Sequence, residues 1–381
     1  MAKLNKIRDA MKENSTIQVD GKSIGIGNPC FIVAEAGVNH NGQMDLARQL
    51  IDQAKAVGAD AVKFQIFVPD EIATKDAAKG AYQKETTGES ESQYEMLTKL
   101  ALTEEQFEEL QDYSKEVGII FYATPHDLAS VDIFDRLNLP VIKIASPDLN
   151  NGLLLYKISQ NETLKTKPLF LSTGGGTFED VGRSLEFLKS HGFDGPLLVY
   201  HCTSSYPTPS EEQNLLVLGE YKKRFGQKFN ALVGFSDNGD NVEVPADAVV
   251  LGAVSVEKHM TLDKNMPGPD HRASLNAEEF KEMVRLIREA ESTGRTAVKN
   301  TDALGDGVKR VQPSEADNIE IFRKAVRARA DMAVGDLVSF ERLIPKRTRG
   351  KYNPMDFEVL LGRKLKVSVS ADQEITPEMV E

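Results

Sequence analysis

Tryptophan and cysteine are the scarcest residues of this sequence, with none and two among 381 residues. Cys30 and Cys202 lie far apart and cannot build a disulfide framework, so we interpret them as two core thiols of a reduced protein. Long apolar runs are also missing, because none approaches the ~18 residues that a transmembrane helix needs. The stretch of residues 1–15 is charged and lacks the apolar segment of a signal peptide. We therefore expect a cytoplasmic protein that has no membrane partner.

Positive charge is scarce as well, since 46 Lys+Arg face 58 Asp+Glu and leave a net charge of −12. A general nucleic-acid binder would normally show a basic stripe, so no nucleic-acid partner is expected. The negative net charge does not exclude a small anionic substrate, because a few local lysines or arginines can determine the charge of one pocket. The length exceeds the ~250–300 residues that one core holds, which predicts a large domain and a smaller one.

Eight short apolar runs recur between residues 31 and 260. Several are almost continuous in Val, Ile, Leu and Phe, which is typical of strands buried on both faces. They span residues 31–37, 61–67, 119–125, 141–146, 169–174, 197–203, 231–237 and 249–260.

Amphipathic segments fill the gaps between these runs, with apolar stripes across residues 46–57, 107–117, 181–188 and 280–287. The second stripe follows a capping signal formed by Thr103 and Gln106. Strand and helix patterns that alternate eight times predict a (β/α)₈ TIM barrel, with a doubly wound open sheet as the alternative. Residues 70–95 are polar and predict a lid or an active-site loop.

The pattern changes in the last quarter of the chain. The barrel is assigned to residues 1–291, and residues 292–318 lose their periodicity and are interpreted as a linker. Residues 319–381 predict a small β-rich domain, in which Leu365 and Val369 belong to a half-buried strand.

Two lysines stand inside apolar runs, at Lys63 and Lys143. Burying an ammonium group without a partner is costly, so an anionic ligand or a carboxylate neighbour is expected beside each. In a barrel the carboxyl ends of the strands share one mouth, where catalytic groups gather.

The strand ends carry motifs in a distinctive order. They read AEAGVNHNG (34–42), KFQ (63–65), KIASPD (143–148), LSTGGG (171–176), HCTSSYPTP (201–209), GFSDN (234–238) and VEKHM with MPGPDHRASL (256–275). With these motifs the chain resembles the sialic acid synthase family, which makes N-acetylneuraminic, legionaminic and pseudaminic acids. The segments MAVGDLVSFERLIPKR and ADQEITPEMVE resemble the antifreeze-like (β-clip, SAF) domain of that family.

The resemblance implies a transferase of the EC 2.5.1 class that joins phosphoenolpyruvate to the open-chain aldehyde of an N-acylated amino sugar. C3 of phosphoenolpyruvate attacks the aldehyde carbon, water adds at C2 and phosphate leaves. The product is a nine-carbon 2-keto-3-deoxy acid. The acceptor would be N-acetylmannosamine, its 6-phosphate or a 2,4-diacetamido hexose, and the free sugar is favoured because no second basic cluster is visible.

The resemblance also assigns roles to individual residues. Glu35, Asp148 and Lys143 match catalytic positions, and Asp148 is the candidate for proton transfer. The phosphoenolpyruvate contacts would be Lys63, Lys143, Ser146, Ser172, Ser204 and Ser236. The sugar contacts would be Gln65, Tyr94, Thr124, Tyr206, Asp270 and Arg347.

The family usually holds a divalent metal with two histidines, but here only His259 is one of them and Asn238 takes the other place. An asparagine carbonyl suits Mg²⁺ or Mn²⁺. The metal is then retained by His259, Asn238 and water, or it is lost and hydrogen bonds activate the aldehyde, or the activity has diverged. Retention, which we favour, predicts that Mn²⁺ or Mg²⁺ raises the rate and that EDTA abolishes it.

The resemblance further implies a domain-swapped homodimer in which an arginine of the C-terminal domain covers the partner's sugar site. Arg347 fits that position best, and Arg349 is the alternative. Two other functions stay open. One is a Schiff-base aldolase that uses Lys143 or Lys63, which borohydride trapping with pyruvate would reveal. The other is a non-catalytic protein that binds sugar or phosphoenolpyruvate.

Overall fold

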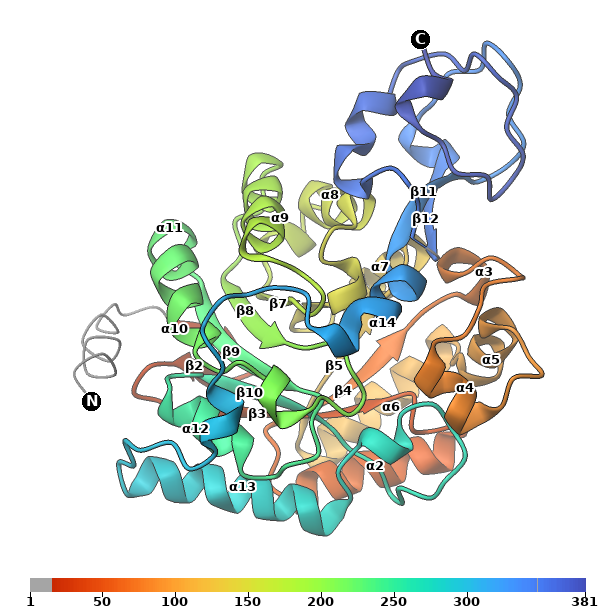
Figure 1. Ribbon diagram of the computed structural model, residues 1–381. Helices are drawn as coiled ribbons and strands as arrows, with labels where there is room; N and C mark the ends of the chain where they lie inside the picture. The colour runs from red at the N-terminus through yellow and green to blue at the C-terminus, as the bar shows by residue number, and fades with distance from the viewer. Residues whose placement is uncertain (1–15, 348) are drawn as a thin grey trace.

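Eight parallel strands form a nearly closed barrel in the computed structural model, which describes residues 16–347 and 349–381 (Figure 1). The barrel strands are β3 (Phe31–Gly37), β4 (Ala61–Ile66), β5 (Ile120–Pro125), β6 (Ile142–Ile144), β7 (Leu169–Ser172), β8 (Leu197–Cys202), β9 (Leu232–Asp237) and β10 (Ser255–His259). The first strand, β3, pairs with both β4 and the last strand, β10, so the sheet curls back on itself. This confirms the predicted TIM barrel and excludes the open sheet. Residues 1–15 of the predicted barrel range lie outside the described residues.

The register of the strands places the polar residues of the motifs next to one another. Glu35 of β3 lies opposite Lys63 of β4 on one side and His259 of β10 on the other. Ser236 of β9 lies opposite Glu257 of β10 in the same way. Because all the ladders are parallel, these residues come together at one mouth of the barrel.

Helices cover the outside of the ring. They are α2 (Met44–Ala56), α6 (Glu104–Val117), α7 (Leu128–Arg136), α8 (Gly152–Gln160), α9 (Phe178–Ser190), α10 (Val217–Tyr221), α11 (Gln227–Phe229), α12 (Val244–Val250) and α13 (Ala277–Ser292). The expected capping signal is confirmed, since Thr103 and Gln106 form a capping box at the start of α6. No helix in the described ranges is long and apolar enough to cross a membrane.

The strand predicted at residues 249–260 was given too early a start. Val249 and Val250 end helix α12, and β10 begins only at Ser255. The apolar end of the helix and the apolar start of the strand merge into one run in the sequence, so hydrophobicity alone cannot separate them.

Residues 70–95 contain short helices where the sequence predicted a loop. α3 (Pro69–Ile72), α4 (Ala81–Thr87) and α5 (Gln93–Leu100) follow β4. They bury a small apolar cluster that includes Met96, Leu97 and Leu100. This cluster holds the insertion in a defined position beside the mouth.

The remaining short elements lie before, between and after the barrel strands. A hairpin of β1 (Thr16–Val19) and β2 (Lys22–Gly25) precedes the ring. Single turns and one π-helical segment occur at η1 (Ser146–Asp148), η2 (Leu164–Thr166), η3 (Ser210–Glu212), η4 (Lys222–Gly226) and η5 (His271–Ala273).

The C-terminal part crosses the barrel and then projects from it as a separate lobe, drawn in blue in Figure 1. It comprises η6 (Thr301–Leu304), η7 (Pro313–Glu315), α14 (Ala316–Phe322), β11 (Lys324–Ala328), η8 (Phe340–Arg342), β12 (Leu343–Arg347), η9 (Pro354–Leu360) and η10 (Pro377–Met379). β11 and β12 pair antiparallel, with Lys324 opposite Arg347.

The prediction of a half-buried strand near the C-terminus is wrong. Leu365 and Val369 are buried, but each makes only an isolated bridge, and Val367 is 45% exposed. The alternation in sequence reflects two separate contacts with neighbouring loops.

Candidate active site

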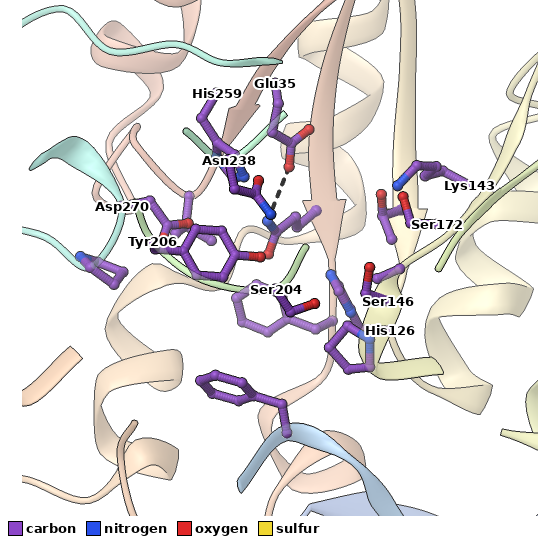
Figure 2. A pocket seen from close by; sticks show the side chains of 18 of the residues that line it. Glu35, His126, Lys143, Ser146, Ser172, Ser204, Tyr206, Asn238, His259 and Asp270 are labelled. Atoms are coloured by element: carbon purple, nitrogen blue, oxygen red, sulfur yellow. Dashed lines mark hydrogen bonds between the residues drawn. The ribbon is translucent and has the colours of Figure 1, made fainter. Parts of the chain in front are cut away.

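A pocket of about 920 Å³, including space open to solvent, lies at the mouth formed by the carboxyl ends of the strands (Figure 2). Most of the predicted site residues line it. They are Glu35, Lys63, Gln65, Thr124, Lys143, Ser146, Ser172, Ser204, Tyr206, Ser236, Asn238, His259, Asp270 and Arg347. Asp148 and Tyr94 are the two predicted residues that are not among its lining residues.

The floor of the pocket is a buried cluster of two lysines and two glutamates. Lys63 Nζ lies 2.5 Å from Glu35 Oε2 and 3.7 Å from Glu257 Oε1, and Lys143 Nζ lies 3.2 Å from Glu257 Oε1. The expected carboxylate neighbours of the two lysines are thereby confirmed. Glu257 was not among the predicted site residues, although its place in the VEKH motif indicated it.

The charged groups of this cluster differ in how their surroundings shift their pKa values. Burial raises the pKa of Glu35, although Lys63 opposes this shift. Burial would also raise the pKa of Glu257, but Lys143 and Lys63 together bring it below its ordinary value. Burial and the neighbouring Lys63 lower the pKa of Lys143, with Glu257 acting against them. Glu35 is therefore the carboxyl of this cluster that takes up a proton more readily.

Hydroxyl groups converge beside Lys143 on one side of the pocket (Figure 2). Ser146 Oγ accepts a hydrogen bond of 2.9 Å from the amide of Gly174. A Cβ atom at Gly174 would overlap Ser204 Oγ and approach Ser146 Oγ to 2.8 Å, so only glycine fits between the two serines. Ser172 Oγ is buried and has no hydrogen-bond partner among the described residues. Serine hydroxyls beside a buried ammonium group, one of them unpaired, form a cradle suited to an anion.

The opposite side of the pocket carries Tyr206, Asp270, His259 and Asn238 (Figure 2). The rings of Tyr206 and His259 meet edge to face with centroids 5.8 Å apart. Tyr82 of α4 packs against Tyr206 at 5.0 Å and also lines the pocket.

The tyrosine that the insertion contributes is therefore Tyr82, which the sequence analysis missed. Tyr94 instead lies beneath the ammonium group of Lys75, with Nζ 3.6 Å from the ring centroid. Helix α5 buries Gln93, Met96 and Leu97, which leaves Tyr94 on its other side.

Arg347 enters the pocket from the end of β12 and is 7% exposed. Its Nη1 donates to Gln93 Oε1 over 3.3 Å, and its guanidinium lies 5.1 Å from the ring centroid of Phe322. Arg349 points elsewhere, because it forms an exposed ion pair with Glu320. Between the two candidates, the structure brings Arg347 to the site. Thr348 lies outside the described residues.

Arg347 reaches the pocket of its own chain. The predicted exchange of C-terminal domains between two subunits is thus not needed to bring this arginine to the site. The domain-swapped dimer stays a prediction.

Asp148 is fully buried behind the pocket. Its Oδ1 lies 2.7 Å from Lys324 Nζ and accepts a hydrogen bond of 2.8 Å from Asn151. Burial would raise the pKa of Asp148, but Lys324 and His126 hold it well below its usual range. Asp148 thus stays ionised, and its contact with the pocket runs through His126, a lining residue whose Nδ1 is 3.5 Å from Asp148 Oδ2.

Two side chains offer donor atoms for a divalent metal. Asn238 Nδ2 donates to the carbonyl oxygen of Thr203 over 2.8 Å, and because a carbonyl only accepts, the amide oxygen of Asn238 must face another direction. His259 Nδ1 is buried and lacks a hydrogen-bond partner within the described residues. No group of three His, Cys, Asp or Glu residues in the described ranges could hold a metal ion. The donors present thus fit an ion whose remaining ligands are water or substrate.

Comparison with known proteins finds relatives that are named as acid synthases. A model described as the NeuB family matches residues 50–299. The N,N'-diacetyllegionaminic acid synthase of Campylobacter jejuni is 38% identical over 334 residues, which cover 87% of this chain and 95% of that protein. The N-acetylneuraminate-9-phosphate synthase of Homo sapiens is 33% identical over 363 residues and 95% of each chain.

A solved protein structure is also similar to this chain. The crystal structure of the spore coat polysaccharide biosynthesis protein spsE of Bacillus subtilis superposes with a TM-score of 0.81 at 31% sequence identity. The match covers 96% of this chain and 99% of that one, so it includes the C-terminal part as well as the barrel.

Proposed function

This chain belongs to the NeuB family, and on that premise we propose that it is a nonulosonic acid synthase that condenses phosphoenolpyruvate with the aldehyde of an N-acylated amino sugar. The observation that carries the proposal is the convergence of two buried lysines and several serine hydroxyls at one mouth, opposite a second group of polar side chains. The first group suits a small phosphorylated carboxylate, and the second suits a polyol.

Phosphoenolpyruvate binds on the side of Lys143, Ser146, Ser172 and Ser204. In the cluster the two lysines are already matched by two glutamates, so an anionic ligand draws one partner of each pair toward itself. Lys143 is held by a single glutamate at 3.2 Å and is the cation that most easily turns to a phosphate. The hydroxyl of Ser172, which has no partner among the described residues, adds a donor.

The amino sugar binds on the side of Tyr206 and Asp270, with Arg347 above it. C3 of phosphoenolpyruvate forms a bond to the aldehyde carbon, and the aldehyde oxygen takes a proton. Glu35 supplies this proton once the anionic ligand has drawn Lys63 away from it, because burial then favours its protonated form. Water then adds at C2, and the C–O bond to phosphate breaks.

A divalent ion held by His259 and Asn238 would polarise the aldehyde carbonyl as a Lewis acid when bound. His259 presents a neutral ring nitrogen, since burial lowers its pKa. Asn238 presents its amide oxygen, because its nitrogen is bound to Thr203.

The test is the release of phosphate when the protein is mixed with phosphoenolpyruvate and a panel of amino sugars. We expect phosphate release only with N-acylated acceptors, together with one equivalent of a 2-keto acid, and loss of the rate in EDTA that Mn²⁺ restores. The panel compares N-acetylmannosamine, its 6-phosphate and 2,4-diacetamido hexoses. Lack of phosphate release with every acceptor, in the presence of Mn²⁺, would contradict the proposal.

A Schiff-base aldolase is a second candidate, because the buried Lys143 has a lowered pKa. Its ammonium group lies against Glu257, however, which favours the charged form over the free amine that an imine requires. Borohydride reduction in the presence of pyruvate should leave the mass of the protein unchanged. A mass increase at Lys143 would favour the aldolase.

A further inference from the structure

A buried histidine stands between the pocket and the ionised Asp148. His126 follows β5, is 6% exposed and lines the pocket. Figure 2 shows it close to Ser146, on the side assigned above to phosphoenolpyruvate. Its Nε2 has no hydrogen-bond partner among the described residues, and its Nδ1 has only the carboxylate of Asp148, at 3.5 Å. A buried and unsatisfied imidazole is costly, so this ring calls for a ligand or a reactive role.

One of the two carboxylate oxygens of Asp148 faces this ring. Its Oδ1 is saturated by Lys324 and Asn151, whereas its Oδ2 has only the Nδ1 of His126 at 3.5 Å. A carboxylate beside Nδ1 favours the tautomer in which Nδ1 carries the hydrogen. The lone pair of a neutral ring is then on Nε2.

Lys324 of the C-terminal part holds both members of the pair in place. Its buried ammonium group binds the carboxylate of Asp148 and also donates to the backbone carbonyl of His126. Because Lys324 begins β11, the lobe contributes to the order of this pair from outside the barrel.

We propose that His126 is the base that accepts a proton from the water molecule adding at C2, and that Asp148 and Lys324 are the residues that position it. This deepens the proposed function and rests on it. Asp148 stays a carboxylate throughout, as in other units where a buried aspartate orients a histidine.

The protons balance across the reaction. As the water oxygen bonds to C2, one O–H bond breaks and its proton moves to Nε2 of His126. The imidazolium ion next to Asp148 then gives this proton to phosphate as the C–O bond breaks, and the ring is neutral again. The second proton of water leaves when C2 becomes a ketone, and it restores the proton that Glu35 gave to the aldehyde oxygen.

The charges around the ring keep it ready to accept a proton. The charged groups that face His126 are Asp148 from η1, Lys324 from β11 and Arg347 from β12. Burial lowers the pKa of His126 to about 4, while Asp148 opposes this shift and Arg347 and Lys324 add to it. The ring is therefore neutral at pH 7, and an anionic substrate beside it makes it more basic.

The first experiment replaces His126 by asparagine, which keeps a planar polar side chain, and measures phosphate release at saturating acceptor. A positioned base contributes typically 10²–10⁴-fold, so we expect kcat to fall about 100-fold or more while the KM for phosphoenolpyruvate changes less than about threefold. Asp148→Asn should lower kcat about 10-fold with the same KM. His191→Asn, at the end of α9 and not among the residues that line the pocket, is the matched control and should keep the wild-type rate.

The second experiment separates a base from a structural role. In His126→Ala, added imidazole should restore the rate, and the rescue should rise with pH as neutral imidazole replaces imidazolium. If His126→Asn retained the wild-type kcat, or if His126→Ala bound phosphoenolpyruvate by calorimetry and gained nothing from imidazole, the assignment would be wrong. If the wild-type protein released no phosphate, the proposed function itself would be wrong. The assignment of His126, which rests on that function, would then be wrong as well.

Discussion

Arg347 differs from the other cations of the pocket in its origin and in its partner. Lys63 and Lys143 come from barrel strands and face carboxylates, whereas Arg347 comes from β12 and binds the amide of Gln93. Its guanidinium is buried and rests near the ring of Phe322. An amide holds a guanidinium more weakly than a carboxylate, so Arg347 keeps donors available for an acceptor sugar.

Replacing Arg347 by alanine is therefore expected to act on the acceptor. Loss of a charged hydrogen bond of about 1.5–3 kcal/mol predicts a 10- to 100-fold higher KM for the amino sugar. The KM for phosphoenolpyruvate should change little, because the site proposed for that substrate lies on the other side of the pocket. Steady-state kinetics with each substrate varied in turn measures both constants.

Arg349→Ala is the matched control, since this arginine is 52% exposed and pairs with Glu320 at the surface. It should leave both KM values unchanged. Equal effects of Arg347→Ala on the two substrates, or the same effect from Arg349→Ala, would count against the role.

At the scale of elements, the segment between the barrel and the lobe is bonded to the loops that carry the site. The sequence predicted a linker at 292–318, but this segment is bonded to the strand ends. Glu315 Oε1 accepts hydrogen bonds of 2.6 Å from the amides of Gly175 and Ser204. Lys309 Nζ donates to the carbonyl oxygen of Cys202 over 2.7 Å. The segment thus fixes the loops after β7 and β8, which carry the serine cradle.

Glu315→Ala is expected to weaken both folding and substrate binding. The buried amides of Gly175, Ser204 and Gln312 would lose their acceptor, and each unsatisfied group costs about 1–3 kcal/mol, so the free energy of unfolding should fall by roughly 3 kcal/mol or more. The KM for phosphoenolpyruvate should rise, because Ser204 is no longer held. Urea unfolding and phosphate-release kinetics measure the two effects.

Glu320→Ala is a control from the neighbouring helix α14, where the side chain is 64% exposed. An exposed ion pair contributes about 0–1 kcal/mol, so this variant should unfold almost like the wild type. Equal stability of the Glu315 and Glu320 variants would refute the role of the segment.

At the scale of the whole molecule, the lobe is attached to the barrel by an aromatic cluster and by buried charges. Tyr156 of α8 packs against Phe340 and Phe357 with ring centroids 5.3 and 5.6 Å apart. Lys324 reaches Asp148, and Arg323 Nη1 donates to Asn150 over 2.8 Å. The barrel and the lobe therefore share one site.

Buried histidines make the folded protein sensitive to acid. Burial lowers the pKa of His40 and His126 to about 4 and that of His201 to about 3. In the unfolded chain these rings bind protons near pH 6.5. Between about pH 6.5 and 4 the unfolded state therefore binds more protons, so stability is present above this window and is lost as the pH falls through it.

Some carboxyls act in the opposite direction. Burial raises the pKa of Asp127 to about 6, so the folded state keeps this proton where the unfolded chain has lost it, and the stabilisation it gives fades as the pH rises toward 6. Glu35 and Asp270 are shifted in the same sense. The histidines outnumber these groups, because His259 and His271 are also shifted downward.

We therefore expect the free energy of unfolding to fall by a few kcal/mol, roughly 2–5, between pH 7 and pH 5 at constant ionic strength. Urea titrations at several pH values measure the slope of the free energy of unfolding against pH, which is proportional to the proton uptake on unfolding. His201→Gln should reduce this uptake by about one proton even if it lowers stability overall. A stability that is flat or rises toward pH 5 would show that the carboxyls dominate.

The sequence by itself determined the barrel and most of the pocket. Strands buried on both faces leave a clear signal, and parallel strands place their ends at one mouth, so Lys63 and Lys143 could be placed near that mouth from order alone. The roles of Ser146 and Ser236 came from the resemblance to a known family. Helix α6 was equally accessible, because its capping residues are local in sequence.

Only the tertiary structure decided which side chains complete the site. Asp148 turns away from the pocket because Lys324, far along the chain, neutralises it, and His126 takes its place at the surface of the cavity. Tyr82 lines the pocket and Tyr94 does not, because α5 buries its apolar face. These outcomes depend on contacts between distant segments, and the energies of such contacts leave no periodic pattern in the sequence.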